Sequence, residues 1–239
     1  MKSYQALADF YDQFSLGDCD YDRWKDFILD VAKSHSAHSV VDLACGTGKM
    51  TKLLQSAGLD VIGIDSSAEM LSQAATKCRC KLVLQDICSF RLPRPTQMAV
   101  CVNDGINYLS PQRVTEFFKA VRANLQVGAP FVFDFSTPHK LKDVLAGNVF
   151  YVDQDDATLL WTNKGTQDGV RMELTIFRRD GQGTYTRQDE VHVQYAHSHT
   201  ILQQQLSQCG FRILSVSADY GLPLSDDALR HTIVALAAF

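Results

Sequence analysis

The sequence predicts an α/β fold in which helices cover both faces of a mostly parallel sheet, with an antiparallel β meander inserted into it. Three observations carry this prediction. Residues 39–135 alternate short β-branched runs with segments of helical periodicity, the pattern of repeated βαβ units. Beyond Pro138 the pattern changes to alternating strands separated by turn residues. The 239 residues, 46% of them hydrophobic, are enough for one sizeable core with an appendage.

The parallel part is predicted from apolar runs and helix-start signals, taken along the chain. Strands are expected at 39–44, 60–65, 81–85, 98–103 and 129–135, and helices at 49–56, 68–77 and 111–125. The last of these helices opens with Ser110 as N-cap and Pro111 at its first position. Because βαβ crossovers are right-handed, the helices should lie on both faces of the sheet.

An antiparallel region is expected between residues 148 and 196. Clusters of turn residues at 155–156, 167–169 and 180–183 separate its strands. In two of these strands one face is apolar throughout, and we expect this face to pack: Met172, Leu174 and Ile176, then Val191, Val193 and Tyr195.

The C-terminal part should return to the sheet. A helix at 198–209 is stopped by Gly210, and strands follow at 211–218 and 231–239. The chain is thus expected to divide into a cofactor-binding core with an N-terminal helical cover (1–147), the inserted β region (148–196) and the return to the core (197–239).

Composition narrows the classes of partner. The formal net charge of -4 leaves little basic surface for a phosphate backbone, so bulk nucleic acid is not expected. No run approaches the roughly 18 apolar residues of a membrane span, and the first residues lack the apolar centre of a signal peptide. Seven cysteines without framework spacing indicate free thiols in the cytoplasm. Cys78 and Cys80 are too close for the usual zinc spacing, so no metal is expected.

The strongest functional signal is the stretch VVDLACGTG, where a hydrophobic strand runs into a glycine-containing turn and a helix. Gly46 and Gly48 allow close approach of a ligand to the backbone, and a helix N-terminus favours a carboxylate or phosphate. A second strand ends in Asp65, about the 20 residues downstream at which an acidic side chain takes ribose hydroxyls in dinucleotide folds. These residues predict an adenosine-containing ligand.

The stretches VVDLACGTG, VIGIDSSAEML and LVLQDI resemble, in this order, motifs I, II and III of the class I S-adenosylmethionine-dependent methyltransferases. The resemblance implies their Rossmann-like seven-stranded fold, S-adenosyl-L-methionine as cofactor and S-adenosyl-L-homocysteine as product. The cofactor contacts that it implies are Asp42, Ala44, Gly46 and Gly48 at the methionine end, Asp65 at the ribose, Ser66 and Met70 beside adenine, Asp86 and Ile87 at the adenine amino group, and Asn103 after the fourth strand.

The opening YQALADFYD, followed by YDRW, is similar to the start of a bacterial branch of these enzymes with the signature Y-x-x-x-A-x-x-Y-D. In that branch an N-terminal helix closes over the cofactor, which makes Tyr11, Tyr21 and Trp24 candidates for its cover. Tyr4, Leu7, Ala8 and Tyr11 also recur at helical spacing, so a helix that simply packs on the core explains them as well. Met70 likewise sits at core spacing.

His192 and Glu190 are the candidate catalytic residues, as a base for an oxygen or nitrogen nucleophile. They share a strand face with Gln194, and the alternative is that this face is merely the solvent-exposed side of the sheet. Tyr108, His139 and Tyr195 are candidate substrate-binding residues, His139 because ligands sit at the carboxyl ends of parallel strands.

The turn Asn103-Asp104-Gly105-Ile106 lacks the paired prolines of enzymes that methylate exocyclic amines of nucleic-acid bases, which favours a small-molecule acceptor. A nicotinamide oxidoreductase is the alternative from another class, but the third glycine position of its fingerprint holds Thr51. A module that binds the cofactor without catalysis is the third possibility. The sequence leaves the oligomeric state open.

Overall fold

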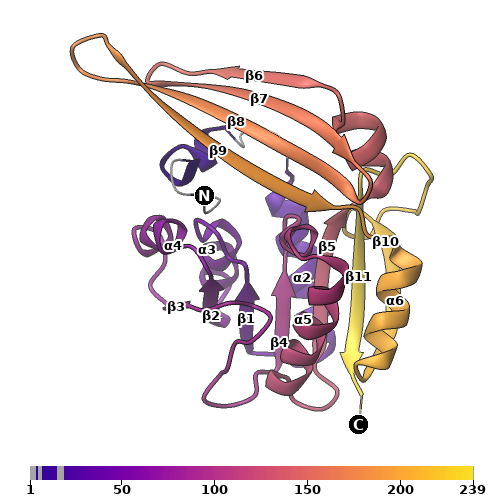
Figure 1. Cartoon of the computed structure of the whole chain (residues 1–239). Helices are drawn as coiled ribbons and strands as arrows, with labels where there is room; N and C mark the ends of the chain where they lie inside the picture. Colours follow the sequence, from indigo (N-terminus) through magenta and orange to yellow (C-terminus); the bar gives the residue numbers. More distant parts are fainter. Residues whose placement is uncertain (1–3, 5–6, 15–18, 239) are drawn as a thin grey trace.

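The computed structural model describes residues 4, 7–14 and 19–238. Two β-sheets organise the chain, a seven-stranded sheet in the core and a four-stranded sheet that lies across the carboxyl ends of its parallel strands (Figure 1). The strands of the larger sheet are β1 (Ser39–Leu43), β2 (Asp60–Asp65), β3 (Lys81–Leu84), β4 (Met98–Cys101), β5 (Pro130–Ser136), β10 (Phe211–Ala218) and β11 (Arg230–Ala237).

The larger sheet has the strand order β10-β11-β5-β4-β1-β2-β3. Strands β1 to β5 are parallel, whereas β11 runs antiparallel to both of its neighbours, β5 and β10. The order reverses between β1 and β4, since the chain first builds outward to β3 and then returns to the other side of β1. Such a reversal is where open α/β sheets leave a crevice for ligands.

Helices cover both faces of this sheet, as predicted from the sequence. The main helices are α2 (Tyr21–Ser34), α3 (Lys49–Ser56), α4 (Ala68–Ala75), α5 (Pro111–Asn124) and α6 (His199–Gln208). Shorter turns are η1 (Leu7–Asp9), α1 (Tyr11–Phe14), η2 (Gly105–Tyr108) and the π-turn η3 (Lys140–Leu145). The sequence patterns did not predict α2, η2 or η3.

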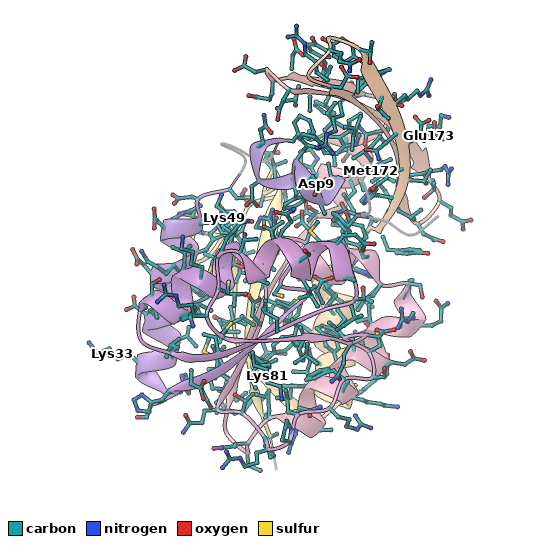
Figure 2. The ribbon with its side chains drawn as sticks, turned by 90° about the vertical axis from the view of Figure 1, so that its left-hand side faces the viewer. Asp9, Lys33, Lys49, Lys81, Met172 and Glu173 are labelled. Carbon is teal, nitrogen blue, oxygen red and sulfur yellow. The ribbon has the colours of Figure 1, made fainter. Side chains whose placement is uncertain are left out.

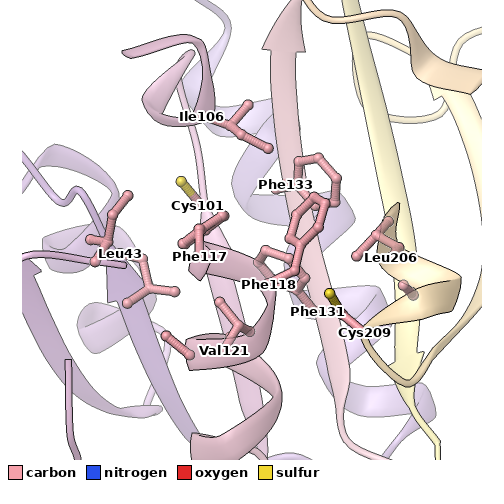
Figure 3. Packing of buried hydrophobic residues seen from close by; sticks show 14 of the residues in the cluster. Leu43, Cys101, Ile106, Phe117, Phe118, Val121, Phe131, Phe133, Leu206 and Cys209 are labelled. Atoms are coloured by element: carbon pink, nitrogen blue, oxygen red, sulfur yellow. The ribbon is translucent and has the colours of Figure 1, made fainter. Parts of the chain in front are cut away.

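The alternation of β5 shows how the two faces are filled. Phe131 and Phe133 point to one side and pack with Phe117 and Phe118 of α5 and with residues of α6 (Figure 3). Val132 between them belongs to the core on the opposite side, with residues of α2 and α3. All four phenylalanines are fully buried, and removal of each side chain from water contributes roughly 1.5–3 kcal/mol to the stability of the fold.

The four-stranded sheet is antiparallel, in the order β6-β7-β8-β9, and confirms the predicted insert. Its strands are β6 (Val149–Asp153), β7 (Ala157–Thr166), β8 (Gly169–Arg179) and β9 (Tyr185–Tyr195). The concave side covers the described N-terminal segment (Tyr4 and residues 7–14), and in Figure 2 Asp9 lies beside Met172 while Glu173 faces away. Leu7 and Phe10 pack with Met172 in one buried cluster.

The expected face of β9 was wrong. Glu190, His192 and Gln194 are buried, and Val191 and Val193 are half-buried on the outer side. The register pairs His192 with Met172 and Glu190 with Leu174, so these polar residues share the packed face of β8. Alternation gives the period of a strand but not which face turns inward, and here the inner face meets polar groups.

Three further features concern membrane spans, metal clusters and cysteines. Among the described residues, no helix is both long and apolar enough to cross a bilayer. The described part of the chain holds no cluster of three side chains suited to a metal ion. All seven cysteines are free thiols.

Candidate active site

A cavity of about 520 Å³ opens at the carboxyl ends of β1 to β4, beneath the N-terminal segment. It therefore lies at the reversal of strand order. Its lining comes from all the predicted motifs and from the N-terminal segment: Tyr4, Tyr11, Tyr21, Ala44, Cys45, Gly46, Thr47, Lys49, Met50, Asp65, Ser66, Ser67, Ala68, Glu69, Met70, Leu84, Asp86, Ile87, Val102, Asn103, Gly105, Tyr108, Leu109 and Arg113.

The two glycines of the turn after β1 have different functions. Both have positive φ, +54° for Gly46 and +77° for Gly48. A Cβ on Gly46 would meet nothing within 4 Å, and Gly46 lines the cavity. A Cβ on Gly48 would lie 2.8 Å from Cys78 Sγ and 2.9 Å from Ala74 Cβ. Gly48 is outside the cavity lining and instead permits close packing of α3 against the end of α4.

Asp65 connects the end of β2 to the glycine turn. The backbone N–H of Gly46 donates to its Oδ2 at 2.8 Å, and that of Ser67 donates to Oδ1 at 2.9 Å. Burial raises the pKa of Asp65, and these donors partly offset the effect. A carboxylate has about four acceptor sites on its two oxygens, so Asp65, which lines the cavity, can also accept hydrogen bonds from a bound ligand.

Asp86 lies at the next strand end and remains half-exposed. Its Oδ1 accepts the Cys88 backbone N–H at 2.9 Å, and Arg113 donates to Oδ2 at 2.5 Å. Burial raises the pKa of Asp86, but the Cys88 and Arg113 donors outweigh it and hold the pKa below its usual value. Met70 and Ile87 are buried and line the same part of the cavity, so Met70 serves both the core and the cavity wall.

Asp42 is completely buried and does not line the cavity. The Thr51 hydroxyl donates to its Oδ2 at 2.5 Å, while Oδ1 has no hydrogen-bond partner among the described residues. Burial raises the pKa of Asp42 to about 7. Thr51 stands where a dinucleotide fingerprint has its third glycine. Its hydroxyl therefore fixes the Asp42 carboxyl at this position.

Asn103 joins the tyrosines of the N-terminal part at one wall of the cavity. Its Nδ2 donates to Tyr11 Oη at 2.9 Å and to Tyr21 Oη at 3.2 Å. Its backbone has φ +59°, which ends β4 before this residue. The Asn103 N–H donates to the buried Asp134 at 2.7 Å. The Lys49 ammonium lies 4.2 Å from the centre of the Tyr21 ring.

Trp24 lies one layer behind this wall and does not line the cavity. It stacks on Tyr220 and carries the Arg230 guanidinium 4.6 Å from its ring centre. Arg230 in turn binds Asp134 at 2.5 Å and Asp104 at 2.7 Å. Trp24 thus supports the charged network that holds the end of β4, rather than covering the cavity as the sequence suggested.

His192 and Glu190 also lie behind the lining, above Tyr108. Tyr108 Oη is 3.3 Å from His192 Nδ1, and His192 Nε2 is 2.9 Å from Glu190 Oε2. Tyr4, which the sequence treated only as part of an amphipathic helix, donates its hydroxyl to Tyr108 at 2.5 Å. Tyr4 and Tyr108 line the cavity, so these four side chains form one connected chain that starts there.

The structure places two further candidates away from the cavity lining. His139 is a partly exposed residue whose Nδ1 pairs with Asp143 at 3.0 Å. The backbone carbonyl of Tyr195 accepts the Asn107 side-chain amide at 2.9 Å, which joins β9 to the turn after β4.

The N-terminal segment closes the cavity from above. Asp12 accepts the Thr47 hydroxyl at 2.6 Å and forms an ion pair with Lys77. On the other side, Glu190 accepts the backbone N–H groups of Tyr4 and Leu7 at 3.0 and 3.1 Å. The segment is therefore held both by the core and by the antiparallel sheet, as a short 3-10 turn and one α-turn rather than the single helix expected.

Sequence reasoning missed Lys49, a cation that lines the cavity. Its charge was the available signal, because a lysine at the first position of a helix opposes the helix dipole and is disfavoured without a further partner. No carboxylate lies within ion-pair distance of Lys49 in the described part of the chain.

The chain belongs to the class I S-adenosylmethionine-dependent methyltransferases, with which its strand order, its cavity and its motifs agree. A family model described as a methyltransferase domain matches residues 40–128. The chain is 30% identical over 227 residues to YqeM of Bacillus subtilis, named as a candidate methyltransferase, and the match covers 91% of this chain and 90% of that one.

Two further relatives extend the comparison. The crystal structure of an S-adenosylmethionine-dependent methyltransferase from Clostridium acetobutylicum superposes with a TM-score of 0.89 at 30% identity and covers 100% of both chains. The dTDP-3-amino-3,4,6-trideoxy-alpha-D-glucopyranose N,N-dimethyltransferase of Streptomyces venezuelae is 33% identical over 111 residues, 43% of this chain and 45% of that one. The protein is thus a methyltransferase that uses S-adenosyl-L-methionine, and the nicotinamide and non-catalytic alternatives are set aside.

Proposed function

We propose that the cavity at the ends of β1 to β4 binds S-adenosyl-L-methionine and that the acceptor is a small molecule methylated on oxygen or nitrogen. The observation that carries the proposal is the place of the Asp65 carboxylate, which lines the cavity at the end of β2 and is fixed there by the glycine turn. The two hydroxyls of one ribose can donate to such a carboxylate. Ser66, Met70 and Ile87 then flank adenine, and Asp86 accepts from its amino group.

Lys49 is the group that we assign to the carboxylate of the cofactor. It follows the glycine turn of Ala44 and Gly46, the end of the cavity that the family motifs give to the methionine part. The ammonium lies over the face of Tyr21, an interaction of roughly 0.5–1 kcal/mol when partly exposed. A carboxylate is a stronger partner, since hydrogen bonds to charged groups contribute about 1.5–3 kcal/mol.

When bound, S-adenosyl-L-methionine supplies a methyl group activated by its sulfonium. The protein's own contribution is to hold two reactants in line and to exclude water, and such positioning supplies up to roughly 7–11 kcal/mol of the barrier. The covering segment around Tyr4 and Tyr11 and the antiparallel sheet above it provide the enclosure.

A small-molecule acceptor is supported by three features. The cavity is closed above by the N-terminal segment, and the net charge of -4 does not favour a nucleic acid. The Streptomyces relative is named for a dTDP-linked amino sugar as its substrate.

Seven free thiols support a cytoplasmic setting.

Calorimetry with S-adenosyl-L-homocysteine tests the cofactor assignment. Asp65→Ala should weaken binding by about 1.5–3 kcal/mol, the scale of hydrogen bonds to a charged acceptor. Asp60→Ala is the matched control, because Asp60 is exposed at the opposite end of the same strand. Equal affinity of the two variants would contradict the assignment of Asp65.

The acceptor class is tested by incubating the protein and methyl-labelled cofactor with a cell extract that is then separated by size. Label should appear in the small-molecule fraction. Label found only in the retained macromolecules would contradict the proposed acceptor class.

A further inference from the structure

We propose that Tyr4, Tyr108, His192 and Glu190 form a proton relay that carries the acceptor's proton from the cavity to the buried His192–Glu190 pair during methyl transfer, and that Tyr4 is the residue that receives it. The inference rests on the proposed cofactor site. It adds a residue, Tyr4, and a direction of transfer to the candidate base named from the sequence.

The positions of the hydrogens along the relay are assigned starting from Glu190. Its Oε1 accepts the Leu7 N–H at 3.1 Å, and its Oε2 accepts the Tyr4 N–H at 3.0 Å. Both oxygens accept hydrogen bonds, and we take Glu190 as ionised, the form in which a carboxyl group only accepts. His192 Nε2, 2.9 Å from Oε2, then carries the proton and donates it. This assigns the tautomer from the network of hydrogen bonds.

The remaining links follow from that tautomer. With its proton on Nε2, neutral His192 presents a lone pair on Nδ1, which accepts the Tyr108 hydroxyl at 3.3 Å. The oxygen of Tyr108 is then an acceptor for the Tyr4 hydroxyl at 2.5 Å. Every hydrogen in the chain points away from the cavity, so the lone pairs of Tyr4 Oη remain to accept a proton from a molecule inside.

Burial makes this chain suitable for relay. His192 and Glu190 are only 2% and 3% exposed, so a proton that reaches the imidazole is shielded from water and is stabilised by the carboxylate beside it. Burial raises the pKa of Tyr108 to about 12 and raises that of Tyr4 well above its usual value. Both phenols therefore stay neutral and pass protons without accumulating as phenolates.

The transfer balances as follows. A lone pair of the acceptor forms a bond to the methyl carbon, and the carbon–sulfur bond breaks with its electron pair left on sulfur. The acceptor's proton moves to Tyr4 Oη, the Tyr4 proton to Tyr108, and the Tyr108 proton to His192 Nδ1. The imidazolium formed there faces the Glu190 carboxylate. After product release the proton returns by the same path to water in the open cavity.

The relay also defines the acceptor. A nucleophile that loses a proton on methylation, an amine or a hydroxyl, needs such a path, whereas a thioether or a tertiary amine does not. The Tyr4 hydroxyl donates to Tyr108, so a proton received at Tyr4 passes along this hydrogen bond.

The first test measures the tautomer directly. Long-range ¹⁵N–¹H NMR of the imidazoles in the full chain, with bound S-adenosyl-L-homocysteine, should show His192 protonated on Nε2 with Nδ1 as a hydrogen-bond acceptor. Tyr108→Phe should shift the Nδ1 resonance and leave the Nε2 proton in place. A proton on Nδ1 in the neutral imidazole would reverse the relay and overturn the proposal.

The second test separates proton transfer from binding. Tyr4→Phe, Tyr108→Phe and His192→Gln should each slow the transfer of label from saturating cofactor to the small molecules of a cell extract by about 10²-fold or more, the usual contribution of acid–base catalysis. Their affinity for S-adenosyl-L-homocysteine should match that of the wild type. Tyr151→Phe and His38→Gln are the controls, since both residues are exposed and neither belongs to the cavity lining.

The outcomes distinguish a failure of the relay from a failure of the cofactor site. Variants that bind the product normally and transfer label at the wild-type rate would overturn the relay and leave the cofactor site intact. A wild-type protein that does not bind S-adenosyl-L-homocysteine would instead contradict the cofactor site. If the wild type binds but labels nothing in the extract, the NMR result alone decides between the two directions of the relay.

Discussion

Replacement of Lys49 by methionine should weaken the binding of S-adenosyl-L-homocysteine and spare a ligand without a carboxylate. A charge-assisted contact contributes about 1.5–3 kcal/mol. Lys49 must leave the face of Tyr21 to make it, which costs roughly 0.5–1 kcal/mol. The net loss is therefore about 0.5–2.5 kcal/mol, or roughly 2- to 60-fold in affinity.

Calorimetry with two ligands measures this loss. 5′-Methylthioadenosine keeps the adenosine and the thioether of S-adenosyl-L-homocysteine but lacks its amino-acid part, so Lys49→Met should leave its affinity unchanged. Lys52→Met is the matched control, because Lys52 is an exposed lysine of the same helix. Equal weakening of both ligands, or of neither, would refute the assignment of Lys49 to the carboxylate.

Three further predictions concern stability. Asp42 has a pKa raised to about 7, so the folded state binds a proton that the unfolded state releases, and the stability of the fold decreases as the pH rises from about 4 to about 7. Asp42→Asn should lack this decrease in melting curves recorded over that pH range, and a parallel decrease in the variant would contradict the prediction. Phe133→Ala should cost about 3–5 kcal/mol in urea unfolding, and a cost below 1 kcal/mol would mean that the core in Figure 3 is packed differently. Gly46→Ala should lower the free energy of unfolding by about 1–2 kcal/mol because of its positive φ. Gly48→Ala should lower it by about 1–3 kcal/mol more, because its Cβ would also meet Cys78, and equal losses in the two variants would contradict this contact.

Much of the fold could be predicted because strands and helices alternate with clear signals. The parallel strands were expected within one or two residues of their ends, and β4 stops earlier because Asn103 and Asp104 have positive φ. The antiparallel insert was also recognised from its turns. Its inward face on β9 was not, since the pattern of Glu190 and His192 is the same whether the face meets water or a covering segment.

The candidate site could be predicted where topology alone brings residues together. Asp65, Asp86 and Asn103 follow parallel strands, and the ends of such strands necessarily share one edge of the sheet. Asp42 of the VVDLACGTG stretch and Trp24 of the N-terminal YDRW stretch instead occupy a layer behind the cavity. Which layer a side chain occupies depends on packing between distant elements, as does the chain from Tyr4 to Glu190.

A crystal structure with S-adenosyl-L-homocysteine tests most directly whether the ends of β1 to β4 hold a single adenosyl ligand. We predict density that runs from Asp86 across Asp65 to the turn at Gly46, with both ribose hydroxyls on the Asp65 carboxylate. Density elsewhere, or a ribose without contact to Asp65, would contradict the account.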